Sequence, residues 1–320
     1  MSLAATPVRK LTQKEIQDFE NDGVIMVKRL VEKNWLNMIE QGVEEATVNA
    51  SVMGKFMSRK TEGYQMDAWL WKRIDVLRDL IYYSPFAHWA QQLMSSEEVR
   101  FFYDQMFVKE PGTDAPTPWH QDLTFWPIRG NQICSFWIPL DSVTRESSGL
   151  QYVRGSHKWP NRFRAVSPDY VASMLDSELE LVPDINADPQ KYDVVDWDME
   201  PGDALIFHPL TLHGSSGNKT RTQRRRALAL RWVGEDVVYA PGKATMPVPY
   251  KHDSEPGRLL QGYAFPRILP THIPAERVIR SKGVESVVAS TIAKSVSNNA
   301  LSAAKLLFSG FKADSVKQTW

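Results

Sequence analysis

Cysteine, net charge and long apolar runs are all scarce in this sequence. Cys134 is the only cysteine among the 320 residues, so no disulfide can form within one chain, which fits a reducing compartment. Lysine with arginine and aspartate with glutamate number 38 each, which leaves no basic excess for binding nucleic acid or anionic membranes. No run of about eighteen apolar residues occurs, and residues 1–10 lack the apolar core of a signal peptide. We therefore expect a cytoplasmic protein that binds neither nucleic acid nor membranes.

The first part of the chain, residues 1–98, has the pattern of a helical segment that packs on a core. Thr12-x-x-Glu15 is a capping-box pattern before a short helix, and apolar residues at helical spacing predict helices over 31–48 and 73–95. The stretch 50–72 is rich in aromatic residues and methionine but irregular, so we interpret it as a loop. Such a loop is either a lid over a substrate or an ordinary covered surface loop, and the sequence leaves both open.

Beyond residue 98 the chain divides into short strand-like runs separated by turns rich in glycine and proline. Such runs, without helices between them, indicate an antiparallel barrel or jelly roll. We therefore predict a mainly β fold with flanking helices, in one structural domain whose core spans 99–235. An acidic, partly helical insert at 160–198 is expected to lie outside this core, and 236–320 to form loops and a final helix. The strands are predicted at 99–109, 118–124, 133–140, 149–153, 203–208, 211–215 and 227–233.

The predicted final helix carries an apolar stripe over 284–308 with few charges. We expect this stripe to pack on the core, and the alternative is the face of a homodimer. No internal repeat is visible, so the chain is not expected to form a repeat array.

The strongest motif for chemistry is Trp119-His120-Gln121-Asp122. His120 and Asp122 are two residues apart, so on an extended strand their side chains leave the same face. A third ligand must come from a distant segment, and His213 stands at the end of a later strand beside a glycine, where the backbone can approach closely. His208, in the preceding apolar run, is the second choice. Two histidines and one carboxylate leave three coordination positions open, which is the ligand set of a non-haem iron(II) that activates O2.

Three open positions suit a bidentate 2-oxo acid with room left for O2. The far carboxylate of 2-oxoglutarate needs a guanidinium as a bidentate partner, and Arg224-Arg225-Arg226 leads into a predicted strand after the distal histidine. Alternate residues of a strand point inward, so either Arg225 alone or Arg224 with Arg226 faces the interior. These residues by themselves leave the choice open.

Several short motifs follow one another in a characteristic order. They are Trp119-His120-Gln121-Asp122, Trp137-Ile138-Pro139-Leu140-Asp141, Gly149-Leu150, Gly155-Ser156-His157, Pro201-Gly202-Asp203 and His213-Gly214-Ser215-x-x-Asn218. Together they resemble the phytanoyl-CoA dioxygenase family over residues 12–235. The resemblance implies a double-stranded β-helix core of the jelly-roll, cupin-like type that uses Fe(II), 2-oxoglutarate and O2. The intact Asp122 disfavours the related halogenating enzymes, in which glycine or alanine replaces this carboxylate.

The resemblance also implies roles for single residues. His120, Asp122 and His213 match the iron ligands on which catalysis depends. The family's spacing from the distal histidine selects Arg224 for 2-oxoglutarate, whereas its spacing to the alanine of the next strand selects Arg225. We favour Arg225, because the inward alternation of a strand is harder to shift than a loop length. Further cofactor candidates, which match pocket positions or share a face of the first core strand, are Ser215, Trp137, Gln105 and Tyr103.

These features predict an iron(II)- and 2-oxoglutarate-dependent dioxygenase that hydroxylates a small molecule and releases succinate and CO2. Desaturation and ring formation are the alternative outcomes. Aromatic and apolar residues near the predicted site favour a hydrophobic substrate, as in secondary metabolism. The rival interpretations are a CoA-ester hydroxylase and a metal-binding cupin module without oxygenase activity. Candidate substrate-lining residues are Met66, Trp69, Phe107, Phe125, Trp126 and Trp232.

Overall fold

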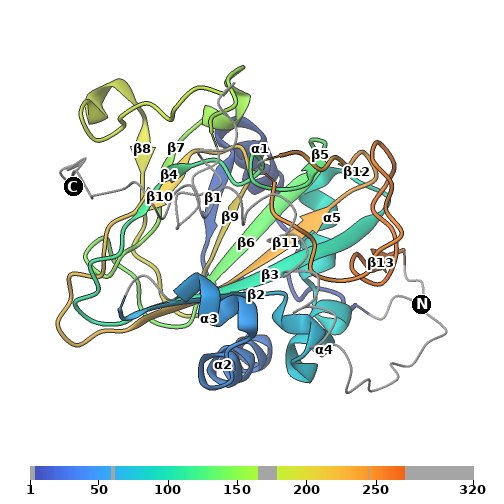
Figure 1. The fold of residues 1–320 in the computed structure, drawn as a ribbon, viewed down its shortest axis with the longest axis horizontal. Coiled ribbons are helices and arrows are strands. Elements are labelled where there is room, and N and C mark those ends of the chain that lie inside the picture. Colours follow the sequence, from blue (N-terminus) through green and yellow to red (C-terminus); the bar gives the residue numbers. More distant parts are fainter. Residues whose placement is uncertain (1–3, 59–61, 165–178, 244, 271–320) are drawn as a thin grey trace, which may run out of the picture.

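The computed structural model describes residues 4–58, 62–164, 179–243 and 245–270, and Figure 1 shows how their elements are arranged. The helices are α1 (Gln13–Asp22), α2 (Lys33–Val48), α3 (Val52–Ser58), α4 (Asp75–Tyr83) and α5 (Phe86–Met94), with the 3-10 turns η1 (Leu70–Lys72), η2 (Ser156–Lys158) and η4 (Pro189–Lys191). The strands are β1 (Val24–Val27), β2 (Tyr64–Ala68), β3 (Val99–Lys109), β4 (Thr117–His120), β5 (Ile128–Arg129), β6 (Ile133–Pro139), β7 (Gln151–Val153), β8 (Val194–Val195), β9 (Ala204–Phe207), β10 (His213–Ser215), β11 (Arg225–Val233), β12 (Val238–Tyr239) and β13 (Arg267–Leu269). Within these ranges no helix reaches the length and apolarity that a bilayer crossing needs. The stripe predicted at 284–308 and residues 165–178 of the insert lie outside the described residues.

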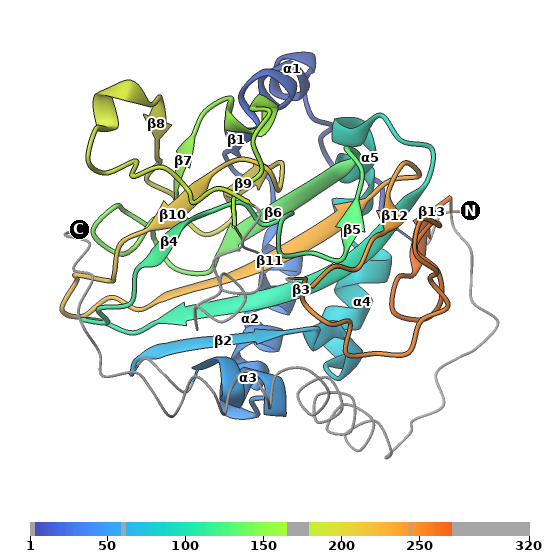
Figure 2. The ribbon, with the colours of Figure 1, turned by 45° about the horizontal axis from the view of Figure 1, so that its top comes forward.

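Two antiparallel sheets form the core. The larger sheet has the strand order β1-β9-β6-β11-β3-β13, with β2 added on β3, and the smaller sheet has the order β4-β10-β7-β8. A separate short pair joins β12 to β5. Figure 2 shows β6, β11, β3 and β2 running side by side. The strands of the smaller sheet lie at the upper left of the same picture. The predicted fold class, a mainly β double-stranded β-helix with flanking helices, is confirmed.

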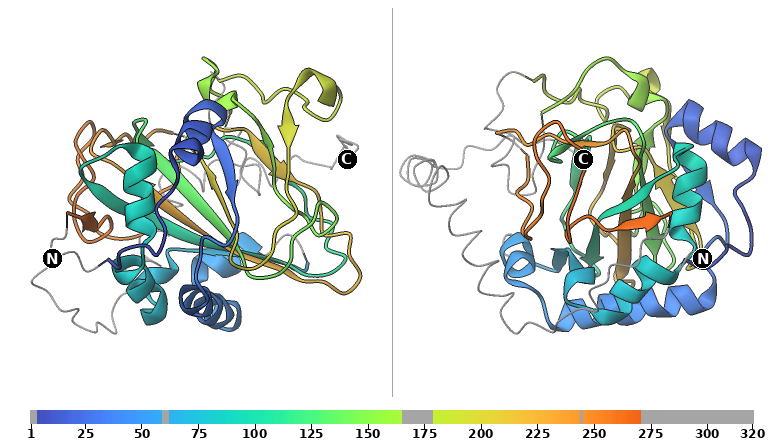
Figure 3. Two further views of the ribbon diagram at one scale, coloured as in Figure 1. Left: turned by 180° about the vertical axis from the view of Figure 1, so that it is seen from behind. Right: turned by 90° about the vertical axis from the view of Figure 1, so that its right-hand side faces the viewer.

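The larger sheet separates two apolar layers. Side chains alternate along a strand, so Phe136 and Ile138 of β6 point to the helices and Trp137 points toward the smaller sheet. Helices α2, α4 and α5 pack on the face that carries Phe136 and Ile138, as the views from behind and from the side in Figure 3 show. There the rings of Phe86 and Phe136 meet with centroids 5.4 Å apart. The other layer lies between the sheets, and it holds the site.

The N-terminal helices follow their sequence signals. The hydroxyl of Thr12 accepts a hydrogen bond from the backbone N–H of Glu15, and the Glu15 carboxylate accepts one from the backbone of Thr12, so the predicted capping box is formed. Helix α2 agrees with the helix predicted over 31–48. The helical run predicted over 73–95 is divided into α4 and α5 at Pro85, because proline lacks the N–H that a continuous helix needs and favours the start of a new one.

The stretch 50–72, predicted as an irregular loop, is regular for most of its length. It contains α3, β2 and η1, and β2 pairs with β3 along its whole length. The buried carboxylate of Asp67 in β2 accepts hydrogen bonds from the N–H and the hydroxyl of Ser51, at 2.8 and 2.6 Å. The carboxylate of Asp67 thus points into the core and binds the segment around Ser51. A charged residue at a buried position interrupts the apolar pattern by which a strand is recognised. The loop prediction is therefore wrong, and the lid role stays a prediction.

The core extends beyond three of its predicted boundaries. Strands β1 and β2 belong to the segment 1–98, predicted to be helical and to pack on the core, but they are strands of the larger sheet. Strand β8 belongs to the insert 160–198 and pairs with β7, so the end of the insert is part of the smaller sheet. Strand β13 lies beyond residue 235 and pairs with β3. Strands of two or three residues are too short to show an alternating pattern, and for this reason the sequence did not reveal them.

Candidate active site

Strand pairing brings the two halves of the predicted metal site together. Strand β10 runs antiparallel to β4, and His213 lies directly opposite His120 in the register. Gly214 permits this approach, because a Cβ at that position would lie 2.8 Å from the carbonyl oxygen of Thr117. Asp122 follows β4, and ligand atoms of all three side chains lie within 4.8 Å of one another. The predicted triad is assembled in the structure.

Both histidines present the same ring nitrogen to a metal. Nδ1 of His120 lies 2.8 Å from the carbonyl oxygen of Pro118, and Nδ1 of His213 lies 2.9 Å from that of Thr211. Each Nδ1 therefore carries and donates the proton, which leaves the Nε2 lone pair free. Oδ1 of Asp122 lies 3.3 Å from Nε2 of His120 and 3.9 Å from Nε2 of His213. Two ring nitrogens and one carboxylate oxygen that converge in this way fit iron(II).

The protonation states of the triad suit a cation. Burial lowers the pKa of His213 to about 4, and the neighbouring His120 acts in the same direction, so the ring is neutral at pH 7. Burial alone would raise the pKa of Asp122, but the adjacent His120, and then His213 and the Arg231 guanidinium, hold it well below its usual range. A neutral imidazole and an ionised carboxylate are the states that metal binding requires.

His208, the alternative third ligand, is a satisfied buried residue. Its Nε2 lies 3.2 Å from the carbonyl oxygen of Asn131, and its Nδ1 accepts the backbone N–H of Leu210 at 3.2 Å. Burial lowers its pKa to about 3, so the ring stays neutral. Both nitrogens are used by the backbone, which leaves His213 as the third member of the triad.

Two aromatic residues that sequence analysis missed hold the distal histidine in place. Tyr152 of β7 lies opposite His213 in the smaller sheet, and the two rings stack with centroids 5.5 Å apart. Phe207 of β9 packs on the same imidazole at 4.9 Å. Both residues lie in predicted strands, but a single sequence does not show which strands become neighbours.

A pair of buried cations lies close to the triad. Lys109 at the end of β3 and Arg225 at the start of β11 are cross-strand partners, and both side chains are buried. Nζ of Lys109 donates to the hydroxyls of Ser148 and Ser215 at 2.8 and 3.0 Å and to the carbonyl oxygen of Ser216 at 3.0 Å. Within the described ranges, Nε of Arg225 has no hydrogen-bond partner. Burial lowers the pKa of Arg225 to about 10 and that of Lys109 well below its usual value. Such a pair is ready for an anion.

The other two arginines of the triplet point away from the interior. Arg224 forms an ion pair with Glu110 at 2.8 Å, and Arg226 forms one with Asp141 at 2.7 Å. Arg225 lies between them and is only 2% exposed. This placement supports Arg225 over Arg224 as the residue for 2-oxoglutarate. Ser215 and Trp137, the other matched pocket positions, lie near the same guanidinium: Ser215 binds Lys109, and the ring of Trp137 is 5.7 Å from the Arg225 carbon.

A second buried arginine reaches the triad from further along β11. Nη2 of Arg231 donates to Oε1 of Gln105 at 2.9 Å and lies 4.0 Å from Oδ2 of Asp122. The guanidinium carbon lies 4.3 Å from the ring centre of Tyr103 and 5.6 Å from that of Trp126. Gln105 and Tyr103, predicted to bind the cofactor, thus contact Arg231. Sequence analysis gave Arg231 no role, although its even spacing from Arg225 places both on one face of the strand.

Most of the candidate substrate residues lie around this interior. Met66 of β2 lies opposite Phe107 of β3, and these partners share one face of the sheet. Trp69 stacks on Tyr103 with ring centroids 5.5 Å apart, and Phe125 packs against the same apolar cluster.

Trp232 does not belong to the site. It lies on the helix side of β11, where its ring meets that of Phe101 with centroids 4.9 Å apart. The prediction for Trp232 is wrong because this residue follows Arg231 directly in the strand, and successive side chains point to opposite faces.

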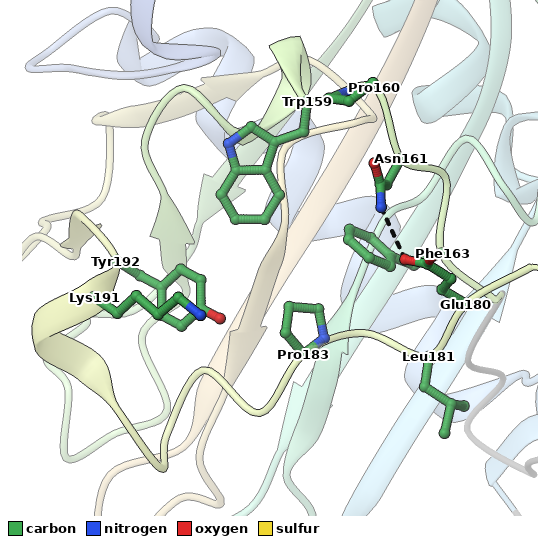
Figure 4. Close-up of a pocket in the computed structure, with 9 residues that line it drawn as sticks. All are labelled: Trp159, Pro160, Asn161, Phe163, Glu180, Leu181, Pro183, Lys191 and Tyr192. Carbon is green, nitrogen blue, oxygen red and sulfur yellow. Dashed lines mark hydrogen bonds between the residues drawn. The ribbon is translucent and has the colours of Figure 1, made fainter.

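A surface hollow lies on the other side of the smaller sheet. Trp159, Phe163 and Tyr192 are among the residues that line it, as Figure 4 shows. Trp119 belongs to the same apolar cluster as Phe163 and precedes His120 in β4. Because neighbouring residues of a strand point to opposite faces, the hollow and the triad lie on different sides of the sheet.

The sequence profile of the phytanoyl-CoA dioxygenase (PhyH) family matches residues 19–227. The chain belongs to this family. A probable phytanoyl-CoA dioxygenase of Caenorhabditis elegans is 24% identical to this PhyH-family chain over 248 residues, which are 71% of the chain and 77% of the relative. The peroxisomal phytanoyl-CoA dioxygenase of Rattus norvegicus is 31% identical over 160 residues, which are 48% of the chain and 45% of the relative.

Solved structures share the fold of this PhyH-family member. The alpha-ketoglutarate-dependent carbocyclase SnoK from nogalamycin biosynthesis has a TM-score of 0.62 and 21% identity, over 82% of this chain and 99% of that one. The epimerase SnoN in complex with Fe3+, alpha-ketoglutarate and nogalamycin RO has a TM-score of 0.64 and 20% identity, over 80% and 98%. Family membership and the assembled triad confirm the predicted enzyme class, an iron(II)- and 2-oxoglutarate-dependent dioxygenase.

Proposed function

We propose that this dioxygenase hydroxylates a hydrophobic small molecule, in secondary metabolism, with 2-oxoglutarate bound between the triad and Arg225. The observation that carries the proposal is the pair of buried cations, Arg225 and Lys109, beside the triad. A dianionic co-substrate supplies the negative charge that these cations lack within the described residues.

The length of the interior between triad and cations suits 2-oxoglutarate. His213 and Ser215 are two residues apart on β10, which corresponds to about 7 Å along a strand. One end of a five-carbon dicarboxylate would lie at the triad, and the far carboxylate would reach Ser215, Lys109 and Arg225. The inward residue that follows Arg225 on β11 is Ala227, whose small side chain leaves room beside the guanidinium.

The residues of the site have separate tasks. When bound, iron(II) and 2-oxoglutarate activate O2 for attack on a substrate C–H bond. His120, Asp122 and His213 would hold the metal, and a set of three protein ligands leaves coordination positions for 2-oxoglutarate and O2. The carbonyls of Pro118 and Thr211 fix both imidazole rings by keeping the proton on Nδ1. The surrounding aromatic layer excludes water from the reacting centre.

Apolar side chains of the interior layer support a hydrophobic substrate. Met66, Phe107 and Phe125 lie around the interior and come from three different segments. SnoK and SnoN, which share the fold, act in the biosynthesis of nogalamycin, and this supports a role in secondary metabolism. The alternative, a CoA ester as in the family's name, is an outcome of the substrate test.

The test is an anaerobic titration with iron(II) and then 2-oxoglutarate, followed by the visible metal-to-ligand charge-transfer band. We expect the band in wild type and in Arg224→Ala, and a loss of at least about tenfold in 2-oxoglutarate affinity in Arg225→Ala. Bound iron without a band in wild type would instead show a metal-binding cupin module. For substrate class, 2-oxoglutarate consumption is compared with free hydrophobic compounds and with acyl-CoA esters. Stimulation by the esters alone would overturn the proposed substrate.

A further inference from the structure

Arg231 is a buried cation with an incomplete set of partners. It is 3% exposed, and its Nη2 donates to Gln105. Nε and Nη1 have no hydrogen-bond partner among the residues that the structure describes. Buried polar groups are almost always satisfied, so an unpaired pair of donors inside a ligand site indicates a group that the ligand supplies.

The charges of the loaded site leave Arg231 unbalanced. Iron(II) and Arg225 bring three positive charges, and Asp122 and 2-oxoglutarate bring three negative ones. The ammonium of Lys109, which donates to Ser215, adds to the positive side of this balance. Oδ2 of Asp122 lies 4.0 Å from Nη2 of Arg231, but the charge of this carboxylate is directed to the metal. At least one positive charge therefore remains in a poorly solvated interior, where it is costly.

Asp104 is the other carboxylate that interacts electrostatically with Arg231, but it does not supply the missing counter-charge. This residue lies on the opposite face of β3, where its carboxylate accepts the backbone N–H of Trp71 at 2.9 Å. Burial raises the pKa of Asp104 to about 7, so half of its charge is already lost near neutral pH. The missing counter-charge has to come from a ligand on the triad side.

We infer that Arg231 binds a carboxylate of the substrate, next to the carbon that is oxidised. The contact with Asp122 places this anion beside a metal ligand, so only a few bonds separate the carboxylate from the reacting C–H. Tyr103 and Trp126 hold the guanidinium against their rings, and a planar, oriented fork of N–H groups matches a carboxylate bidentately. This inference rests on the proposed function and deepens it, because it makes the substrate a hydrophobic acid and not a neutral molecule.

The binding test compares acids with their neutral isosteres. The protein is loaded with manganese(II) and 2-oxoglutarate, which prevents turnover, and titrated with straight-chain carboxylates of increasing length and with the matching primary amides. We expect wild type to bind the best acid about tenfold to a hundredfold more tightly than its amide. Arg231→Gln should abolish this preference, Arg231→Lys should keep part of it, and the surface control Arg224→Gln should keep all of it. Equal binding of acids and amides by wild type, or binding of neither, would overturn the inference.

The second readout is the stability of the loaded protein without substrate. A buried cation without a counter-charge destabilises the protein when no substrate is bound. Arg231→Met should therefore raise the melting temperature. A lower melting temperature, together with no acid preference in wild type, would show that Arg231 only braces Gln105 and Asp122. The charge-transfer band separates the two proposals: its absence in wild type contradicts the proposed function, whereas a normal band without acid preference contradicts this inference alone.

Discussion

The two faces of the larger sheet are built from the same strands but carry opposite kinds of side chain. Toward the helices, β11 presents Leu228, Leu230 and Trp232; toward the smaller sheet it presents Arg225, Ala227, Ala229 and Arg231. The first face is a filled apolar layer, and the second alternates buried cations with small residues. Stability is concentrated on one face of the sheet and ligand binding on the other.

The interior face is incomplete without its ligands. Nε of Arg225, Nε and Nη1 of Arg231 and Oδ2 of Asp122 have no hydrogen-bond partners within the described part of the chain. Each is a polar atom that costs free energy until a ligand binds. The difference between the faces shows where the stability of the site comes from. The apolar layer on the helix face holds the strands in place, whereas the polar atoms that would bind the metal, the dianion and the substrate contribute little stability themselves.

The largest expected effect comes from the helix face. Phe136→Ala removes a fully buried ring that packs on Phe86, and it should lower the free energy of unfolding by about 3–5 kcal/mol. Chemical denaturation measures this loss. Trp137 points the other way, so the charge-transfer band of the folded variant should remain at low temperature. A variant that stays folded but loses the band would show that the two faces are not independent.

A smaller effect concerns pH and the buried histidines. The folded pKa of His208 is lowered to about 3, whereas an unfolded histidine titrates near 6.5. Below about pH 6.5, His208 binds a proton in the unfolded chain but stays neutral in the folded chain. This difference lowers the free energy of unfolding as pH falls. Asp104, whose folded pKa is raised to about 7, makes the protein more stable as pH falls. The contribution of His208 must therefore be measured as the difference in stability between wild type and a variant at this position.

The matched variant is His208→Asn, whose amide oxygen can accept the N–H of Leu210 in place of Nδ1. Between pH 6.5 and 5, metal-free wild type should lose about 1.5 kcal/mol relative to this variant, from the linkage of one histidine. Unfolding by urea at several pH values gives the difference. A constant difference across this range would mean that His208 is not buried in its neutral form.

Features with a local signature could be predicted from the sequence. Strand β3 covers the predicted 99–109, because eleven residues allow the pattern to be seen. His120 and Asp122 are a pair on one strand end, and His213 stands beside a glycine that the close pairing of β10 and β4 requires. Each ligand could therefore be chosen before its partners were placed.

Features that depend on strand neighbours could not be predicted in this way. Tyr152 stacks on His213 only because β7 pairs with β10, and Gln105 binds Arg231 only because β3 pairs with β11. Trp232, by contrast, could have been excluded, because alternation along β11 puts it on the face opposite the inward Arg225. One residue along a strand is enough to exchange the ligand face for the helix face.

The smallest expected effect tests Lys109, the second cation of the interior face. Lys109→Met removes the ammonium but leaves Ser148 and Ser215 paired with each other at 3.2 Å, so the protein should not lose stability. The affinity for 2-oxoglutarate, read from the charge-transfer band, should fall by about tenfold, because one charge-assisted partner of the far carboxylate is lost. Lys219→Met, at an exposed position, is the control. Unchanged affinity would assign the far carboxylate to Arg225 and Ser215 alone and would make Lys109 a structural bridge between β3 and β10. Loss of both affinity and stability would show that Lys109 stabilises the fold, as residues of the helix face do. A residue that belongs to the ligand face alone is expected to affect 2-oxoglutarate affinity without affecting stability.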